Sequence, residues 1–364
     1  MIGVKGKFSV LIPTYNHEKF IVRCIESVLS QTYRNFDVWV IDDCSTDNTV
    51  GLIREFTDPR INLVCNTFNR GINWNLNKLF EMSDGEYVCG IGSDDAMHPE
   101  LLETVADVFS KNPNVGVCYC DLNILDENGR QCSSSRIREN TRLTKEEVLR
   151  ETFLRYPVVW TPGRSARRSI YNSIVPLSSA FMNMQDVEET TRLLFSADFH
   201  VIKKPLVDYR VFEGNVSAAG EVVRMRTECE DSFLMEEFSK QESDDLLNRI
   251  FAADLKVLGL SFGKFNRRYV FARLAMTSSL EHKRRWGYAQ MLALVAEKGI
   301  DGFYTEFGLS YKELLSLSKS LYDPRKDYKR KYKKAAARVK WLVAAIPIVI
   351  FVTVLALAIL WNGV

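Results

Sequence analysis

The sequence lacks several patterns that identify common classes of protein. Its eight cysteines form no Cys-x-x-Cys pair, so a zinc site built on paired thiolates is not indicated. Most of them lie in apolar runs, which favours reduced, buried thiols in a cytosolic compartment over a disulfide framework. They are Cys24, Cys44, Cys65, Cys89, Cys118, Cys120, Cys132 and Cys229.

Two further motifs are missing near the N-terminus. Residues 1–7 contain no apolar h-region, so we expect no signal peptide. The first predicted strand, residues 8–12, is followed by Pro13-Thr14-Tyr15-Asn16 and not by a Gly-x-Gly-x-x-Gly turn. The sequence therefore argues against a bound dinucleotide cofactor.

Charge is absent from one long segment and concentrated in the segment before it. Residues 341–361 contain no ionisable side chain and have a tryptophan at each end. As a helix they would extend roughly 31 Å, close to the ~30 Å hydrocarbon core of a bilayer. Residues 325–340 carry nine Lys or Arg and one Asp, so the rest of the chain carries a net charge of about −6. We therefore predict a transmembrane helix over 341–361 after a basic juxtamembrane segment.

The one-sided position of the basic residues predicts the orientation. Under the positive-inside rule, residues 1 to about 340 lie in the cytoplasm, and the protein is a single-pass protein of the inner (cytoplasmic) membrane. Apolar residues recur at helical spacing from 221 onward. The predicted domains are therefore 1–220, a helical domain over 221–324, the basic segment 325–340 and the membrane helix 341–361.

The first 120 residues alternate between strand and helix patterns. Apolar runs predict strands, and apolar residues at helical spacing predict the helices between them. The strands are 8–12, 36–41, 61–65 and 86–91, and the helices are 17–30, 50–56, 74–82 and 99–110. This order is typical of an α/β fold with a mostly parallel, Rossmann-like sheet flanked by helices.

Two adjacent carboxylates stand where the fourth strand ends. Asp94 and Asp95 follow Gly92-Ser93 and precede a predicted helix. Open α/β sheets bind ligands at such strand ends, and paired carboxylates suit Mg²⁺ or Mn²⁺ carrying a phosphate. The alternative is that both side chains only cap the next helix.

Several linked motifs resemble the signatures of family 2 glycosyltransferases with the GT-A fold. Their order and spacing match over roughly residues 8–120, which is more specific than any one motif. The motifs are Ser9-Val10-Leu11-Ile12-Pro13-Thr14-Tyr15-Asn16, Ser27-Val28-Leu29-Ser30-Gln31-Thr32-Tyr33, Ile41-Asp42-Asp43-Cys44-Ser45-Thr46-Asp47-Asn48-Thr49, Asp84-Gly85-Glu86-Tyr87 and Ser93-Asp94-Asp95.

The resemblance implies roles for individual residues. It places Pro13, Thr14 and Tyr15 at the base and ribose of a nucleotide sugar, Asp43 at the base, Asp94 near the ribose and donor phosphates, and Asp95 as the metal ligand. Farther along, residues 184–189 and 204–217 resemble the family's later motifs and place Asp186 at the catalytic-base position. In the loop 157–168, the guanidinium groups of Arg164 and Arg167 are candidates to hold acceptor phosphates, with a solvated basic loop as the alternative.

This chain departs from the family pattern at three positions. Gln185 stands where the family has Glu, Phe212 where it often has His, and Gly92 where it often has Asp. Each departure removes a potential ligand or hydrogen-bond partner. The segment His282-Lys283-Arg284-Arg285-Trp286 resembles the Gln-x-x-Arg-Trp motif of processive synthases, with His in place of Gln, which favours non-processive transfer.

The sequence therefore predicts an inverting, non-processive, metal-dependent glycosyltransferase of the bacterial, membrane-anchored type. Its expected partners are a nucleotide-sugar donor, a polyprenyl-diphosphate-linked glycan of surface polysaccharide synthesis and the membrane, and no nucleic acid polymer. The alternative is a catalytically degenerate membrane scaffold or sugar-nucleotide-binding protein of the same fold, which the loss of side chains at Gly92 and Phe212 would explain.

Overall fold

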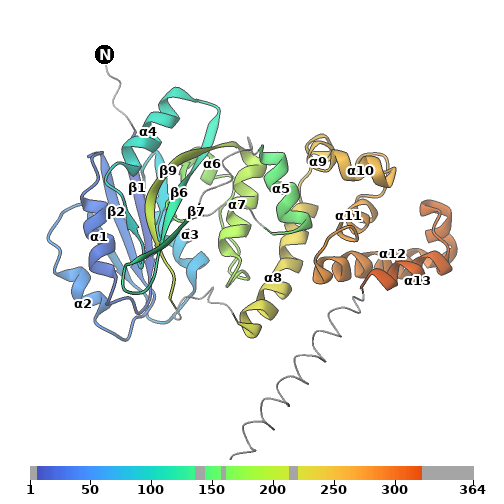
Figure 1. Cartoon of the computed structure of the whole chain (residues 1–364), viewed down its shortest axis with the longest axis horizontal. Helices are drawn as coiled ribbons and strands as arrows, with labels where there is room; N and C mark the ends of the chain where they lie inside the picture. Colours follow the sequence, from blue (N-terminus) through green and yellow to red (C-terminus); the bar gives the residue numbers. More distant parts are fainter. Residues whose placement is uncertain (1–5, 136–143, 157–160, 213–219, 322–364) are drawn as a thin grey trace, which may run out of the picture. The chain divides into compact units, whose positions relative to one another are not determined.

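A computed structural model describes residues 6–135, 144–156, 161–212 and 220–321. The four predicted strands and the helices between them are confirmed (Figure 1). They are β1 (Phe8–Thr14), α1 (Ile21–Leu29), β2 (Phe36–Asp42), α2 (Thr49–Arg54), β3 (Ile61–Cys65), α3 (Ile72–Met82) and β4 (Tyr87–Gly90). The parallel register pairs Thr14 with Asp42 and Leu11 with Gly90, so these strand ends lie along one edge of the sheet.

The rest of the sheet is mixed, so the mostly parallel sheet that the sequence predicts also contains short antiparallel strands. It continues from β4 in the order β8-β6-β9-β5, and β7 pairs with β6. The strands are β5 (Ala96–Met97), β6 (Val115–Leu125), β7 (Gln131–Ser135), β8 (Ser165–Arg167) and β9 (Asp198–Arg210). Strands β8 and β5 run antiparallel to their neighbours. With three and two residues, they are too short to show a periodic pattern in the sequence.

Helices cover both faces of the sheet because alternate strand residues point to opposite sides. On one face, Val10 and Ile12 pack with α1 and with α4 (Leu101–Lys111). On the other face, Leu11 packs with α3, with α5 (Lys145–Leu154) and with α7 (Gln185–Ser196). Both faces of the central strands are therefore buried in apolar cores.

Two local features after the fourth strand follow from residue types in the sequence, Asn128-Gly129 for a hairpin turn and Thr144 with Glu147 for a helix cap. β6 and β7 form a hairpin whose turn is closed by a hydrogen bond from the Asp126 N–H to the Arg130 carbonyl, and Gly129 has φ of +80°. Helix α5 begins with a capping box, in which the Thr144 hydroxyl accepts from the Glu147 N–H and the Glu147 carboxylate accepts from the Thr144 N–H.

The chain divides into two compact units, residues 1–291 and 292–364. Residues 220 and 221, at which the sequence predicts a domain boundary, lie within the first unit. The remaining helices are α6 (Arg168–Tyr171), α8 (Glu221–Ser239), α9 (Asp244–Ile250), α10 (Ala252–Leu258), α11 (Arg267–Ala275), α12 (Glu281–Phe307, with a kink at Gly299), α13 (Tyr311–Ser318) and a 3-10 turn (Lys319–Leu321).

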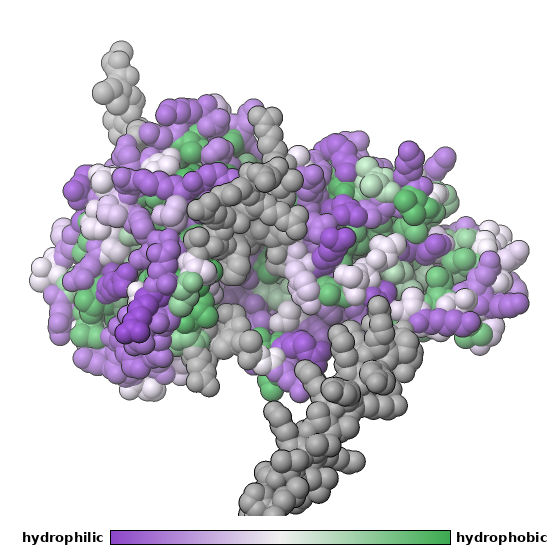
Figure 2. Space-filling model, in the orientation of Figure 1, coloured by the Kyte–Doolittle hydropathy of each residue, from purple (hydrophilic) through white to green (hydrophobic). Residues whose placement is uncertain are grey.

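Helices α8 to α11 share the apolar core of α5 and α7. Phe238, Phe251 and Phe271 of this helical region surround Phe153 of α5 with ring centroids 5.0 to 5.7 Å away. No helix among the described residues is long and apolar enough to cross a membrane. The predicted span 341–361 lies outside the described residues. The molecular face drawn in Figure 2 is mainly hydrophilic, with scattered apolar groups.

A buried charged cluster joins α12 to α8 and α5. The Lys283 ammonium, on a side chain only 2% exposed, donates to the Thr152 carbonyl at 2.6 Å and lies 3.3 Å from the Asp231 carboxylate. His282 Nε2 lies 2.6 Å from the other oxygen of Asp231. Burial lowers the pKa of Lys283. The cluster therefore balances one buried carboxylate against two nitrogen groups.

Replacing Lys283 by Ala is expected to lower the free energy of unfolding by about 3 kcal/mol, because it leaves the Asp231 charge buried with one partner fewer. Urea unfolding followed by circular dichroism measures the change. The matched control is Arg285→Ala on the same helix. Arg285 is 58% exposed and forms a surface ion pair with Glu281, so this loss should stay below about 0.5 kcal/mol. Equal losses in both variants would contradict a special role for the buried cluster.

Candidate active site at the strand ends

The loops after β1 and β2 are tied together at the edge of the sheet. The Ser45 hydroxyl accepts from the Asn16 N–H at 2.8 Å, and the Asn16 side-chain carbonyl accepts from the Thr46 N–H at 2.8 Å. Asn16 adopts φ of +53°, a conformation that asparagine tolerates better than most residues. These contacts leave the Tyr15 ring 44% exposed above the strand ends, where the sequence predicts the nucleotide.

Asp43 organises the loop after β3. Its carboxylate is buried and accepts from the Asn66 amide at 2.8 Å and from the backbone N–H groups of Arg70 and Gly71 at 2.8 and 2.9 Å. Its own N–H donates to the Thr14 carbonyl. Asp43 therefore lies beside Thr14, as the prediction requires, and it also fixes a loop that the sequence analysis did not include in the site.

The acidic turn after β4 folds both carboxylates over one glycine. A Cβ atom at Gly92 would lie 2.8 Å from an Asp94 oxygen and 3.0 Å from an Asp95 oxygen. The Asp95 side chain is 5% exposed, and one of its oxygens accepts from the Arg210 N–H at 2.9 Å. The absence of a side chain at position 92 therefore allows the two carboxylates to converge.

Burial of the two carboxylates makes their ionisation unfavourable. Burial, followed by the charge of Asp94, raises the pKa of Asp95 well above its ordinary value. The pKa of Asp94 is also raised by burial, with a partial opposing effect of His17. His17 Nδ1 lies 2.6 Å from the Ser93 hydroxyl, so this ring borders the turn.

The turn fits a divalent cation in its chemistry. Two convergent, buried oxygen donors of like charge are stabilised by a bound cation, and carboxylate oxygens suit Mg²⁺ and Mn²⁺. Among the residues that the structure describes, no group of three or more His, Cys, Asp or Glu side chains could hold a metal ion. A cation at Asp94 and Asp95 would therefore need further ligands from phosphate oxygens or water.

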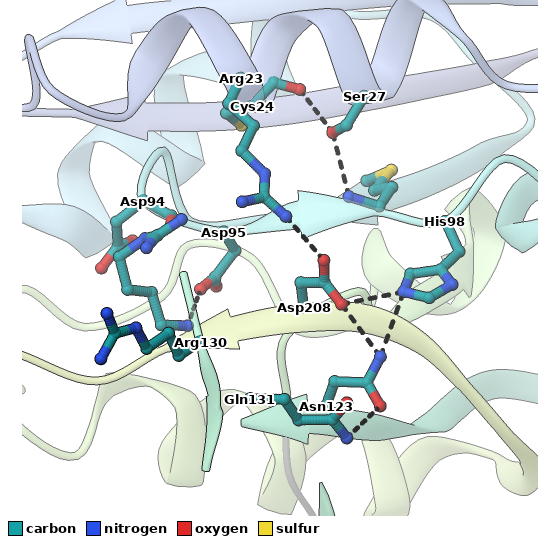
Figure 3. Close-up of polar contacts among 12 residues, drawn as sticks. Arg23, Cys24, Ser27, Asp94, Asp95, His98, Asn123, Arg130, Gln131 and Asp208 are labelled. Carbon is teal, nitrogen blue, oxygen red and sulfur yellow. Dashed lines mark hydrogen bonds and ion pairs between the residues drawn. The ribbon is translucent and has the colours of Figure 1, made fainter. Parts of the chain in front are cut away.

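A polar cluster lies beside the acidic turn (Figure 3). The Asp208 carboxylate on β9 accepts from Arg23 at 2.9 Å and from Asn123 at 3.0 Å, and it lies 2.9 Å from His98 Nε2. Burial alone would raise the pKa of Asp208, but the hydrogen bonds from Asn123 and His98 lower it. Asp208 is therefore a satisfied structural carboxylate, in contrast to Asp95.

The loop 161–164 brings Asp186 to the end of β4. The Gly90 N–H donates to the Arg164 carbonyl and the Gly163 N–H donates to the Gly90 carbonyl, both at 3.1 Å. The Thr161 hydroxyl at the start of this loop donates to the Asp186 carboxylate at 3.2 Å. Asp186, in the first turn of α7, thus lies at the same strand end from which the acidic turn begins.

The surroundings of Asp186 suit a proton acceptor. Burial raises the pKa of its carboxyl above the ordinary 3.8, and the nearby Arg164 guanidinium limits the rise. Arg164 is 8% exposed and forms an ion pair with Glu189 on the next turn of α7. The carboxylate is therefore poised to ionise at a higher pH than an ordinary aspartate.

The two predicted phosphate-binding arginines have different positions. Arg164 lies near Asp186, but its charge is paired with Glu189, and its contact with an acceptor phosphate stays a prediction. Arg167 pairs with Tyr87, the first residue of β4, and so lies at the opposite end of that strand from Gly90 and the acidic turn. Its guanidinium donates to the carbonyls of Phe109 and Val115 at 2.7 and 2.9 Å, so we withdraw its predicted role.

Three residues that surround the site were missed by the sequence analysis. His17 contacts the acidic turn, Arg210 donates to the carbonyl of Asp94 at 3.1 Å, and Glu230 on α8 contacts the loop before α7. Arg210 is the second residue of a recognisable Tyr-Arg dipeptide, which could have drawn attention to it. Glu230 lies in a helix with no motif, and only the tertiary structure shows its position.

Comparison with known proteins gives a family and a fold. Residues 9–175 match the family model described as glycosyl transferase family 2. A UDP-Glc:alpha-D-GlcNAc-diphosphoundecaprenol beta-1,3-glucosyltransferase of Escherichia coli is 35% identical over 120 residues, which are 33% of this chain and 47% of that protein. Chondroitin synthase of E. coli is 29% identical over 171 residues, which are 46% of this chain and 25% of that protein. The chain thus spans half or less of these relatives.

Solved structures share the fold at low sequence identity. TarS of S. aureus, residues 1–349 in complex with UDP-GlcNAc, superposes with a TM-score of 0.54 at 21% identity, over 80% of this chain and 92% of that one. A mannosyltransferase of Pyrobaculum calidifontis in complex with GDP-Man and Mn²⁺ gives a TM-score of 0.51 at 16% identity, over 90% and 84% of the chains. The predicted GT-A fold is confirmed, and its sheet includes the short antiparallel strands described above.

Replacing Asp95 by Asn is expected to stabilise the protein in the absence of divalent cations. The change removes a buried charge that Asp94 repels, and the amide oxygen still accepts from the Arg210 N–H. We expect a gain of about 1 kcal/mol, which corresponds to roughly 2–4 °C in melting temperature. Differential scanning calorimetry at pH 7 with EDTA measures it.

The matched control is Asp208→Asn, which also neutralises a largely buried carboxylate. Because hydrogen bonds lower the pKa of Asp208, its ionised form stabilises the fold above that pKa, and the contribution is lost as the pH falls through it. This variant should therefore melt at a lower temperature than the wild type. A lower melting temperature for Asp95→Asn would show that the acidic turn is not strained by its charge.

Proposed function

We propose, from the match of residues 9–175 to the glycosyl transferase family 2 model, that this chain transfers a sugar from a nucleotide-diphosphate sugar to an acceptor hydroxyl with inversion. The observation that carries the proposal is the junction at Gly90. There the loop 161–164 joins Asp186, a carboxylate with a raised pKa, to the strand end that carries Asp94 and Asp95. A base and a diphosphate site on one strand end are what a single displacement requires.

In this mechanism the oxygen of the acceptor hydroxyl attacks the anomeric carbon, and Asp186 accepts the proton of that hydroxyl. The bond from the anomeric carbon to the donor phosphate breaks, and the nucleoside diphosphate leaves. Thr161 and Arg164 orient and partly balance the carboxylate. The donor nucleotide lies over Pro13, Thr14 and Tyr15, with Asp43 shaping its pocket.

Asp95 and Asp94 are the residues that would hold Mg²⁺ or Mn²⁺ together with the donor diphosphate. A bound cation neutralises the charge that develops on the leaving diphosphate. Their convergence over Gly92 supports this assignment, and Arg210 fixes Asp95 through its backbone N–H. One carboxylate fewer than in the common family motif leaves the donor phosphates to complete the coordination.

We further propose a polyprenyl-diphosphate-linked glycan as acceptor at the cytoplasmic face of the membrane. The E. coli relative that names a diphosphoundecaprenol acceptor supports this choice. The predicted membrane helix 341–361 and its basic flank support the location, since a tethered enzyme meets lipid-borne acceptors at high effective concentration. His282 in place of the Gln of the Gln-x-x-Arg-Trp motif supports non-processive transfer, with one sugar added per encounter.

Replacing Asp186 by Asn should lower kcat for sugar transfer by about 10²–10⁴-fold, the range typical of a lost general base. The donor Kd should stay unchanged, because Asn keeps the side chain's shape and its contact with Thr161. The assay follows radiolabelled sugar from a panel of UDP- and GDP-sugars into a polyprenyl-diphosphate-linked sugar in detergent micelles, with binding measured by calorimetry.

Three possible outcomes of this assay distinguish the base role, the acceptor class and the scaffold alternative. Wild-type-like transfer by Asp186→Asn would exclude the base role. Transfer by the wild type only to soluble acceptors would exclude the lipid-linked acceptor but leave the reaction type intact. Binding of nucleotide sugars with neither transfer nor slow hydrolysis would favour the scaffold alternative.

The pH dependence of kcat/KM should rise through a limb that lies above the ordinary aspartate pKa. Asp186 acts in its ionised form, and its pKa is raised by burial, so activity is lost as the pH falls through that raised value. Rates measured from about pH 4 to about pH 9 locate the limb. The residual rate of Asp186→Asn should lack it. A wild-type profile that is flat down to about pH 4 would contradict the assignment.

A further inference from the structure

Helix α7, which carries Asp186, begins without a cap of its own. Its N-cap residue is Met184, whose side chain offers no hydrogen-bond acceptor of a capping type, and no side-chain cap is formed. The backbone N–H groups at a helix start have no partner within the helix and need one from elsewhere. A buried helix start of this kind requires an acceptor from another element.

Glu230 on α8 supplies an acceptor at this helix start, for the N-cap residue and the residue before it. One oxygen of its carboxylate accepts from the N–H groups of Asn183 and Met184 at 2.9 and 2.8 Å. The Asn183 amide also donates to the Thr227 hydroxyl, one turn earlier on α8, at 2.7 Å. Glu230 is 4% exposed, so these are buried, charge-assisted hydrogen bonds, which are stronger than neutral ones.

The capping carboxylate is itself held in place by the rest of α8. The adjacent Asp231 is anchored to His282 and Lys283 of α12, and Glu236 accepts from the Trp286 indole at 3.2 Å. Leu234 and Phe238 on the same helix lie in the core shared with α7. The motif-like segment 282–286 is thus tied to the helix that holds the start of α7.

We propose that Glu230 is a positioning residue for sugar transfer: by capping α7 from α8, it fixes Asp186 against the acceptor. The inference rests on the proposed function, because it takes Asp186 as the base. Asp186 follows the capped Met184 by two residues, so its Cα moves with the helix start. A displacement of about 1 Å at a catalytic group can cost roughly 10²-fold in rate.

The first test compares substitutions of Glu230 in the full chain. Glu230→Ala removes the acceptor and should lower kcat by about 10–100-fold, with the donor Kd within about 2-fold of wild type. Glu230→Gln keeps an acceptor oxygen and should restore kcat to within about 3-fold of wild type. Glu228→Ala is the matched control on the same helix, since Glu228 forms an ion pair with Arg224 of that helix. It should leave kcat unchanged.

The decisive test is a double-mutant cycle with Asp186→Asn. If Glu230 acts through Asp186, Glu230→Ala should lower the residual rate of Asp186→Asn by less than about 3-fold. The same 10–100-fold loss in both backgrounds would overturn the proposal, because it would show a general structural effect. A fall in donor affinity that parallels kcat would overturn it as well.

Two outcomes remain distinguishable from failure of the proposed function. If Asp186→Asn alone retains full activity, the base assignment fails whatever Glu230 does. Should Glu230→Ala not fold, as judged by circular dichroism, Thr227→Val replaces it in the cycle. That variant removes only the hydroxyl that accepts from the Asn183 amide, and a loss of kcat that persists unchanged in the Asp186→Asn background would again contradict the proposal.

Discussion

The pair of backbone hydrogen bonds between Gly90 and residues 163–164 is the contact on which the arrangement of the site depends. β4 is only four residues long, and without a neighbour on this side its end would be an unpaired edge. The loop 161–164 pairs with it and then continues into β8, which separates β4 from β6 in the sheet. The loop 161–164 and β8 therefore complete the sheet next to β4, and the same loop places Thr161 and Arg164 beside Asp186.

The site concentrates negative charge that the fold only partly balances. Burial raises the pKa of Asp94, Asp95 and Asp186. Arg210 and Arg164 each lie among these groups, but Arg164 is paired with Glu189. Such an arrangement costs stability, in contrast to the satisfied Asp208 nearby, and it is sustained by the large cores on both faces of the sheet. A bound cation or a ligand with hydrogen-bond donors would reduce this cost in stability.

Regular elements were predictable from the sequence because their signals are local. The strands 8–12 and 36–41 are indicated by mainly apolar runs, and the cap of α5 has a local signal in Thr144 and Glu147. β5 and β8 were not predictable, since strands of two and three residues are defined by their partners. The full length of β9 was not predictable either, because it continues through Pro205 to Arg210 and its pairing with β6 outweighs the local effect of that proline.

The side chains of the site also differ in whether a local sequence signal or only a tertiary contact indicates their position. The positions of Asp43, Asp94, Asp95 and Asp186 were predictable because each follows a strand or begins a helix in a linked set of motifs, and their roles stay predictions. Arg167 was misjudged because a count of guanidinium groups in the segment 157–168 carries no information about which edge of the sheet each one faces. The register of β8 against β4, with Arg167 opposite Tyr87, settles that question and is a tertiary property.

The helical region after residue 220 shows why the spacing of apolar residues alone underestimates how much of a helix is buried. On α8 the buried face contains Leu234 and Phe238, but it also contains the carboxylates of Glu230 and Asp231. A pattern that counts only apolar side chains assigns these two residues to solvent and makes α8 part of a separate domain. Burying two carboxylates is unfavourable unless each finds partners, and the partners lie on α7 and α12. Their burial therefore requires the elements before and after residue 220 to fold together.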